Sequence, residues 1–150
     1  MRLDRAFLVT AIAWVVALPA AAFAASRLAA PPIAYDVALA VYAVGHVVCH
    51  QLPARSFHLW HVSLPVCARC TGIYIGAAAA ALAIAAARRP SAVARRAGTD
   101  PRRILLLAFA PTALTLVFEW TTGVTPANWI RALAGFPLGA AVAWAIGMVD

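Results

Sequence analysis

Residues 71–87 read TGIYIGAAAAALAIAAA, a stretch that carries no charge and is more than half alanine. Because about 20 apolar helical residues cross the roughly 30 Å hydrocarbon layer of a bilayer, this stretch predicts a transmembrane helix. Four more apolar segments flank it, at residues 6–25, 33–48, 104–118 and 132–149. All are continuous and lack the alternation of barrel strands. The sequence therefore predicts an all-α fold, a polytopic transmembrane helical bundle with about four to five spans.

The composition supports the membrane class and excludes others. Hydrophobic residues make up 65% of the chain and charged residues 11%, whereas soluble domains carry about 45–50% and about 25%. The net charge of +7 comes entirely from arginine, and no basic face with interleaved aromatic residues suggests nucleic-acid binding. We expect residues 1–150 to form a single integral membrane domain whose partner is the lipid bilayer.

An arginine-rich linker at residues 88–103 separates the third and fourth segments. It contains six arginines against one acidic residue, Asp100, so the positive-inside rule predicts that it is cytoplasmic. Five spans would then place Arg2 and Arg5 outside, against the same rule. The conflict disappears if the second segment is re-entrant, or if the first is a cleaved signal peptide. We favour a retained first span, because its apolar stretch exceeds the usual 7–15 residues of a signal core.

The residues best suited to chemistry are concentrated in a short part of the chain. All three cysteines and all four histidines lie between residues 46 and 70. The sequence His46-Val47-Val48-Cys49-His50 is expected to close the second helix, with His46, Cys49 and His50 on one face. The second group, Cys67-Ala68-Arg69-Cys70, directly precedes the third apolar segment. Close ligand pairs on separate backbone elements are typical of a Cys/His metal site.

Three interpretations of this group are open. The first is a tetrahedral metal site of Cys49, His50, Cys67 and Cys70, with His46 or His61 as the alternative nitrogen ligand. Zinc is the expected metal, because Cys₃His is a known structural zinc set; iron and copper are alternatives. Such a site indicates a structural, sensing or accessory role.

The second interpretation is a thiol–disulfide oxidoreductase in which Cys67 and Cys70 form a disulfide and Cys49 is the exchange partner. A helix N-terminus and the neighbouring Arg69 both favour a thiolate there. The third is ordinary packing of small apolar thiols. Whether the protein is an enzyme is left open by the sequence.

Other polar residues are expected near the same membrane face. If the second, third and fourth segments all cross, the loop at residues 49–70 and the turn at residues 119–131 share that face. Glu119 and Arg131 predict an interfacial ion pair that fixes the last helical hairpin; alternatively, Glu119 is a further metal ligand or a proton acceptor. Outer hydrogen-bond partners of the thiolates and imidazoles are expected from four residues of the cluster and its loop: Gln51, Arg55, Ser56 and Arg69.

Two pairs of glycines at four-residue spacing predict close helix packing. Gly72 with Gly76 and Gly135 with Gly139 would let two helices approach closely, as transmembrane helices do without a hydrophobic driving force. We favour packing within one chain over a seam between two chains.

Two motifs carry a family resemblance: CHQLPARSF at residues 49–57 and PVCARCTGIYIG at residues 65–76. They resemble the signature of an uncharacterised prokaryotic membrane family, domain of unknown function 2085, over roughly residues 40–145. A later block, GVTPAN at residues 123–128 with Arg131, is similar too, although the family usually has Asp near Glu119.

The resemblance implies a small helical bundle with this Cys-His and Cys-x-x-Cys pairing, and no established activity. It suggests a protein of the prokaryotic cytoplasmic membrane. With the arginine-rich linker in the cytoplasm, the positive-inside rule predicts that the site lies on the external face. Such a protein could act as a homo-oligomer or as an accessory subunit of a larger membrane complex.

Overall fold

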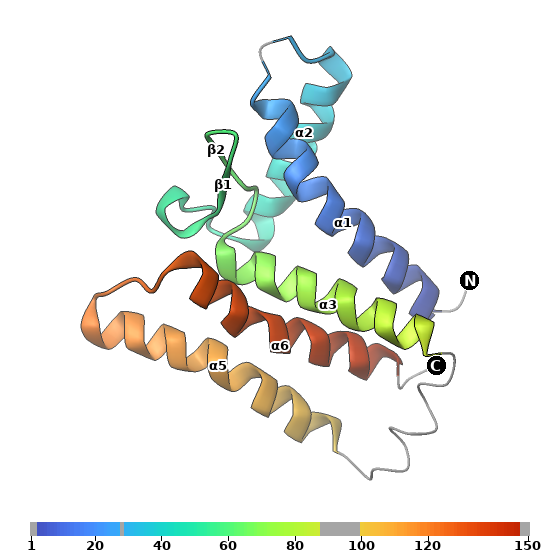
Figure 1. Ribbon diagram of the computed structural model, residues 1–150, viewed down its shortest axis with the longest axis vertical. Helices are drawn as coiled ribbons and strands as arrows, with labels where there is room; N and C mark the ends of the chain where they lie inside the picture. Colours follow the sequence, from blue (N-terminus) through green and yellow to red (C-terminus); the bar gives the residue numbers. More distant parts are fainter. Residues whose placement is uncertain (1–2, 28, 88–99, 148–150) are drawn as a thin grey trace.

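The computed structural model describes residues 3–27, 29–87 and 100–147, and within them it is mostly α-helical (Figure 1). Its helices are α1 (Leu3–Ala25), α2 (Pro32–Val48), α3 (Ala68–Ala86), α5 (Pro101–Thr122) and α6 (Asn128–Gly147). Between α2 and α3 lie a 3₁₀ turn, η1 (Pro53–Arg55), and a small antiparallel hairpin, β1 (His58–Leu59) with β2 (Val62–Ser63). The predicted all-α membrane bundle is confirmed.

Four of the five predicted segments form helices long and apolar enough to cross a bilayer: α1, α3, α5 and α6. The second segment also forms an apolar helix, but α2 has only 17 residues. It folds back beside α1, and the two helices form an arm that extends past the start of α3 (Figure 1). These helix lengths agree with four membrane spans, the lower end of the predicted range of four to five. Residues 88–99 of the arginine-rich linker lie outside the described residues.

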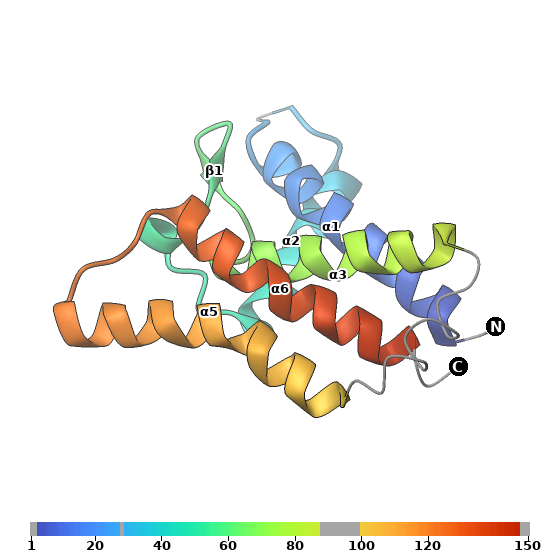
Figure 2. The same ribbon diagram turned by 60° about the horizontal axis from the view of Figure 1, so that its bottom comes forward.

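The centre of the bundle is the contact between α3 and α6, which lie side by side, with α5 on the other side of α6 (Figure 2). A methyl group on Gly72 would overlap the backbone carbonyl of Ala132, and one on Gly139 would overlap that of Ile73. The two backbones therefore touch where the glycine pairs lie. The prediction that the glycines pack helices within one chain is confirmed.

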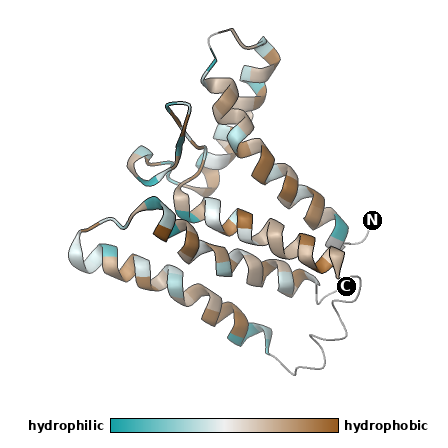
Figure 3. Cartoon of the chain, viewed as in Figure 1, coloured by the Kyte–Doolittle hydropathy of each residue, from teal (hydrophilic) through white to brown (hydrophobic). Residues whose placement is uncertain are grey.

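Large apolar side chains cover the outside of the helices, as a protein in lipid requires. Val9, Leu107 and Leu114 each expose between 63% and 74% of their surface. Figure 3 shows this pattern: hydrophobic colours run along the middle of the helices, and hydrophilic colours gather at helix ends and in the hairpin loop. In water this surface would be a large aggregation-prone patch; in a bilayer it is in contact with acyl chains.

The two ends of the bundle differ in what they carry. The start of α1, the end of α3 and the start of α5 lie at one end (Figures 1 and 2). The end of α2, the loop with η1 and the hairpin, and the starts of α3 and α6 lie at the other end. Nearly all the residues expected to carry chemistry are therefore at one end of the bundle.

Candidate metal centre

The first part of the centre is the end of α2, where the chain leaves the helix earlier than expected. The helix ends at Val48, and Cys49 has an extended backbone with φ −149° and ψ 142°. The prediction that His46, Cys49 and His50 share one helical face is therefore wrong. The physical reason is Gln51, whose side-chain amide donates hydrogen bonds of 2.7 Å to the carbonyls of Tyr42 and Pro65 and holds the chain turned back.

The second part is the first turn of α3. Cys67 is the N-cap of this helix and Cys70 lies one turn further on, on the same face. The helix begins three residues before the predicted segment, so Cys70 is inside it. The extended residue Cys49 reaches this turn from α2, and the backbone N–H of Cys67 donates a hydrogen bond of 3.1 Å to Cys49 Sγ.

Together these elements form the thiol cluster: Cys49, Cys67 and Cys70. Their three Sγ atoms all lie within 4.8 Å of one another, and Cys49 is only 8% exposed. Two thiolates on one tetrahedral zinc lie about 3.8 Å apart, given Zn–S bonds of about 2.3 Å. The cluster therefore fits a metal ion after a small inward movement, and the N–H···S bond would help to hold a thiolate ligand in place.

Burial around the cluster comes from the apolar residues of three elements. Leu18 of α1, Val66 of the loop and Cys49 form one buried core, against which Trp14 and Tyr74 pack. The rings of Trp14 and Tyr74 meet edge to face, 5.9 Å apart. The thiols are therefore shielded on the α1 side, so α1 is a structural part of the centre.

Cys67, which lies just outside the candidate span, has an acidic thiol. The hydrogen bond from the Cys70 side chain lowers the pKa of Cys67 to about 5, against the opposing effect of burial. A thiolate is the form that binds metals and attacks disulfides. At neutral pH the cluster therefore already holds one such group.

We expect this acidity to be visible in metal-free protein. The rate at which iodoacetamide alkylates Cys67, followed by mass spectrometry in EDTA, should stay high at neutral pH and fall as the pH drops through about 5, because the thiolate is lost below its pKa. In the variant Cys70→Ala, whose side chain has no hydrogen-bond donor, the midpoint should move up towards the ordinary thiol value of about 8.5. An unchanged midpoint in that variant would contradict the role given to Cys70.

The histidines predicted as ligands lie outside the thiol cluster. Among the described residues, the group of possible metal ligands at this place consists of the three cysteines alone. His50 directly follows Cys49 and is exposed; His46 is also exposed. The structure therefore brings together three of the four expected ligands, the cysteines, and places the histidines outside their cluster.

His61 is placed by a hairpin that the sequence analysis missed. Trp60 and His61 form the two-residue turn between β1 and β2, with φ values of 51° and 65°. Two-residue hairpin turns with positive φ favour Asn-Gly. Because Trp60-His61 does not resemble that pair, the sequence did not predict this hairpin. It is held by packing: the centre of the Trp60 ring lies 5.0 Å from that of Phe23, at the end of α1. The Arg27 guanidinium lies over the Phe23 ring.

A second polar group, the arginine–glutamate cluster, lies at the same end of the bundle: Arg55, Arg69, Glu119 and Arg131. Glu119 Oε1 accepts from Arg69 Nη2 at 2.8 Å and from Arg131 Nε at 3.0 Å, and Arg55 Nη1 lies 3.5 Å from Oε2. Glu119 is 6% exposed and Arg131 is 1% exposed. The predicted ion pair of Glu119 with Arg131 is confirmed. Glu119 is not part of the group of possible metal ligands.

The residues expected as outer partners of the thiols make other contacts. Arg55 and Arg69 form ion pairs with the buried carboxylate of Glu119. The Ser56 hydroxyl donates to the carbonyl of Leu52, and the Gln51 amide holds the backbone. These side chains therefore shape the loop around the thiols and do not hydrogen-bond to sulfur.

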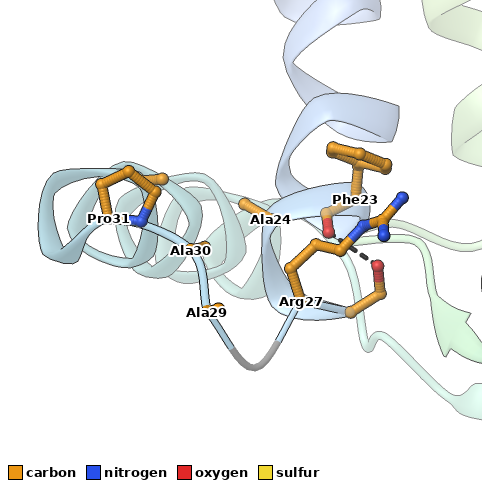
Figure 4. A pocket seen from close by; sticks show the side chains of 8 residues that line it. Phe23, Ala24, Arg27, Ala29, Ala30 and Pro31 are labelled. Carbon is orange, nitrogen blue, oxygen red and sulfur yellow. Dashed lines mark hydrogen bonds between the residues drawn. The ribbon is translucent and has the colours of Figure 1, made fainter.

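A separate pocket of about 660 Å³ lies at the connection between α1 and α2 (Figure 4). Half of its lining residues are alanines, and the others are Phe23, Ser26, Arg27 and Pro31. The described residues that line it include no thiol, imidazole or carboxylate that could bind a metal.

Fold and site together define a small helical membrane protein with a buried thiol cluster at one end of its bundle. The chain belongs to the family described as predicted membrane protein, DUF2085, whose profile matches residues 49–145. The matched region includes all three cysteines and all four members of the arginine–glutamate cluster. The family resemblance noted in the sequence is confirmed.

Two curated relatives are similar over short stretches. An uncharacterised protein of Methanocaldococcus jannaschii is 48% identical over 40 residues, which are 27% of this chain and 26% of the relative. An uncharacterised protein of Methanothermobacter thermautotrophicus is 53% identical over 30 residues, 20% of this chain and 27% of the relative. The matches thus span about a quarter of these relatives' length. No solved structure matches the chain.

Proposed function

We propose that the thiol cluster binds a zinc ion that fixes α2 to α3, with His50 as the fourth ligand. The observation that carries this proposal is the convergence of Cys49, Cys67 and Cys70, whose Sγ atoms all lie within 4.8 Å of one another. Packing alone does not require all the thiols of a chain to meet at one point. Three thiolates with one imidazole form a closed zinc set, which supports a structural, sensing or accessory role.

Metal analysis of the purified protein tests this proposal. We expect about one zinc per chain in the wild type and none in the double variant Cys67→Ser with Cys70→Ser, because tetrahedral sites need their thiolates. Removing zinc with a chelator should also lower the thermal midpoint, since metal binding stabilises the folded site. A wild type that binds no metal would end the proposal. A coloured protein would indicate iron or copper.

The nitrogen ligand is identified by a histidine series. The variant His50→Ala should lose zinc to a chelator more readily than the wild type, while His46→Ala and His61→Ala should not. His58→Ala is the matched control, because this histidine is in the same loop and is not a candidate ligand. Retention of zinc by all four variants would assign the fourth position to water or to a partner protein.

The topology that fits these observations has four crossings, by α1, α3, α5 and α6. Arg5 near the start of α1 and Arg102 and Arg103 at the start of α5 then lie on one side, as the positive-inside rule requires. The short helix α2 stays on the opposite side with the thiol cluster. The conflict between Arg5 and the linker disappears, and the centre faces the exterior of the prokaryotic cytoplasmic membrane.

The second candidate function is thiol–disulfide exchange, favoured by the low pKa of Cys67. Its thiolate would attack a partner's disulfide, and Cys70 would then displace the partner as a dithiol, leaving the Cys67–Cys70 disulfide. The variant Cys70→Ser should then trap the mixed disulfide with the partner. Thiols that stay reduced and blocked by metal would exclude this function.

A further inference from the structure

The arginine–glutamate cluster carries more positive charge than its own carboxylate can balance. Arg55, Arg69 and Arg131 all lie within 3.5 Å of Glu119. A guanidinium stays protonated at every physiological pH, so three positive charges meet one negative charge. The sequence has no other Asp or Glu from residue 37 to 99 or from 101 to 149. The cluster therefore holds an excess of two positive charges.

This excess is costly where it lies. Arg131 is 1% exposed, and the side chain of Arg69 is 12% exposed. Charges taken out of water to this degree are normally paired, because water no longer screens their repulsion. The starts of α3 and α6 add partial positive charge at this end, and the end of α5 offsets only part of it. The surroundings therefore favour a further anion.

Hydrogen-bond donors are also left over. Arg69 Nε is buried and has no partner among the described residues. Within the described part of the chain, Arg131 Nη1 donates only one hydrogen bond, a long one of 3.4 Å to the carbonyl of Arg55. The two oxygens of Glu119 are already shared among three guanidiniums, so they cannot accept from these groups as well. Arg55, whose side chain is 40% exposed, gives the cluster an edge that is open to a ligand.

We propose that Arg55, Arg69 and Arg131 bind a phosphate-type oxyanion beside Glu119. A guanidinium offers two parallel N–H groups that match the oxygens of a phosphate. The cluster lies at the ends of candidate spans, at the depth where basic pockets between helices meet lipid phosphates. The oxyanion is either the headgroup phosphate of an anionic phospholipid or free phosphate from the aqueous side. The site is separate from the thiol cluster and does not depend on a metal.

Binding measurements on delipidated full-length protein in detergent test this site. The probes are inorganic phosphate and dioleoylphosphatidylglycerol, titrated at low ionic strength. The variant Arg55→Gln should bind about tenfold more weakly than the wild type, the effect of one lost charge-assisted hydrogen bond. Arg103→Gln is the matched control, because its side chain is 84% exposed and lies at the other end of α5; it should bind like the wild type.

The two probes distinguish the sources of the oxyanion. Tighter binding of the lipid, weakened in Arg55→Gln, identifies a headgroup; binding of phosphate alone, weakened likewise, identifies a soluble ligand. Either result supports the site. Wild-type affinity in Arg55→Gln, or no binding of either probe, would overturn it.

A second variant keeps the test independent of Arg55. Glu119→Gln leaves all three guanidiniums without their carboxylate, so added phosphate should raise its thermal midpoint more than that of the wild type. An equal rise in both proteins would contradict the proposal, because phosphate would then act elsewhere.

Discussion

The variant Glu119→Gln should lose about 3–5 kcal/mol of unfolding free energy, the usual cost of removing one partner from a buried ion pair. Its neutral amide would keep the shape of the carboxylate but leave Arg69 and Arg131 facing each other uncompensated. These two residues lie in the first turns of α3 and α6, and Glu119 lies in the last turn of α5. The loss should therefore weaken the attachment of α5 to the rest of the bundle. Unfolding with sodium dodecyl sulfate, followed by circular dichroism, measures it.

Asp100→Asn is the matched control for this loss. Asp100 pairs with Arg103 at 4.0 Å, and both side chains are largely exposed, so the pair contributes less than about 1 kcal/mol. Asparagine also keeps the N-cap bond that the Arg102 N–H makes with residue 100. If the two variants were equally stable, the buried cluster would not hold the helices together.

The variant Gly139→Ala should destabilise the protein by about 3 kcal/mol, the upper part of the range for overpacking. Its added methyl group would overlap the backbone carbonyl of Ile73. A backbone cannot move aside as a side chain can, so α3 and α6 would have to separate along their whole contact. The same detergent unfolding measures the change.

Gly147→Ala is the control on the same helix. A methyl group there would meet only side-chain carbons of Ile84, at 3.5 Å or more. Because alanine favours helices over glycine by up to about 1 kcal/mol, this variant should be as stable as the wild type or slightly more stable. Equal destabilisation by both variants would contradict the prediction, because the close contact at Gly139 would then not be the cause of the loss.

The helices could be predicted from the sequence because lipid imposes a local requirement. A segment such as residues 71–87 must satisfy its backbone hydrogen bonds internally, and only a helix does so in hydrocarbon. The glycine pairs were likewise readable, since their spacing fits one helix face. Hydropathy did not decide whether residues 33–48 cross the bilayer, because a 17-residue helix is near the lower length limit for a membrane span.

The candidate site was only partly predictable. The three cysteines were recognisable as a group because they share a short stretch of sequence with the histidines. The prediction that His46, Cys49 and His50 share one helical face was wrong. Gln51 ends the helix through hydrogen bonds to the carbonyls of Tyr42 and Pro65. Contacts of this kind join residues far apart in the chain, and no local periodicity reports them.

The sequence by itself determined the environment of this protein and the residues able to bind a metal, because hydropathy and residue type are properties of each position. The tertiary structure alone decided which of those residues meet. It brought Cys49 to Cys67 and Cys70, left the histidines outside the thiol cluster, and turned Arg55 and Arg69 towards Glu119. The physical reason is that proximity and burial depend on packing between helices, and only the folded chain establishes that packing.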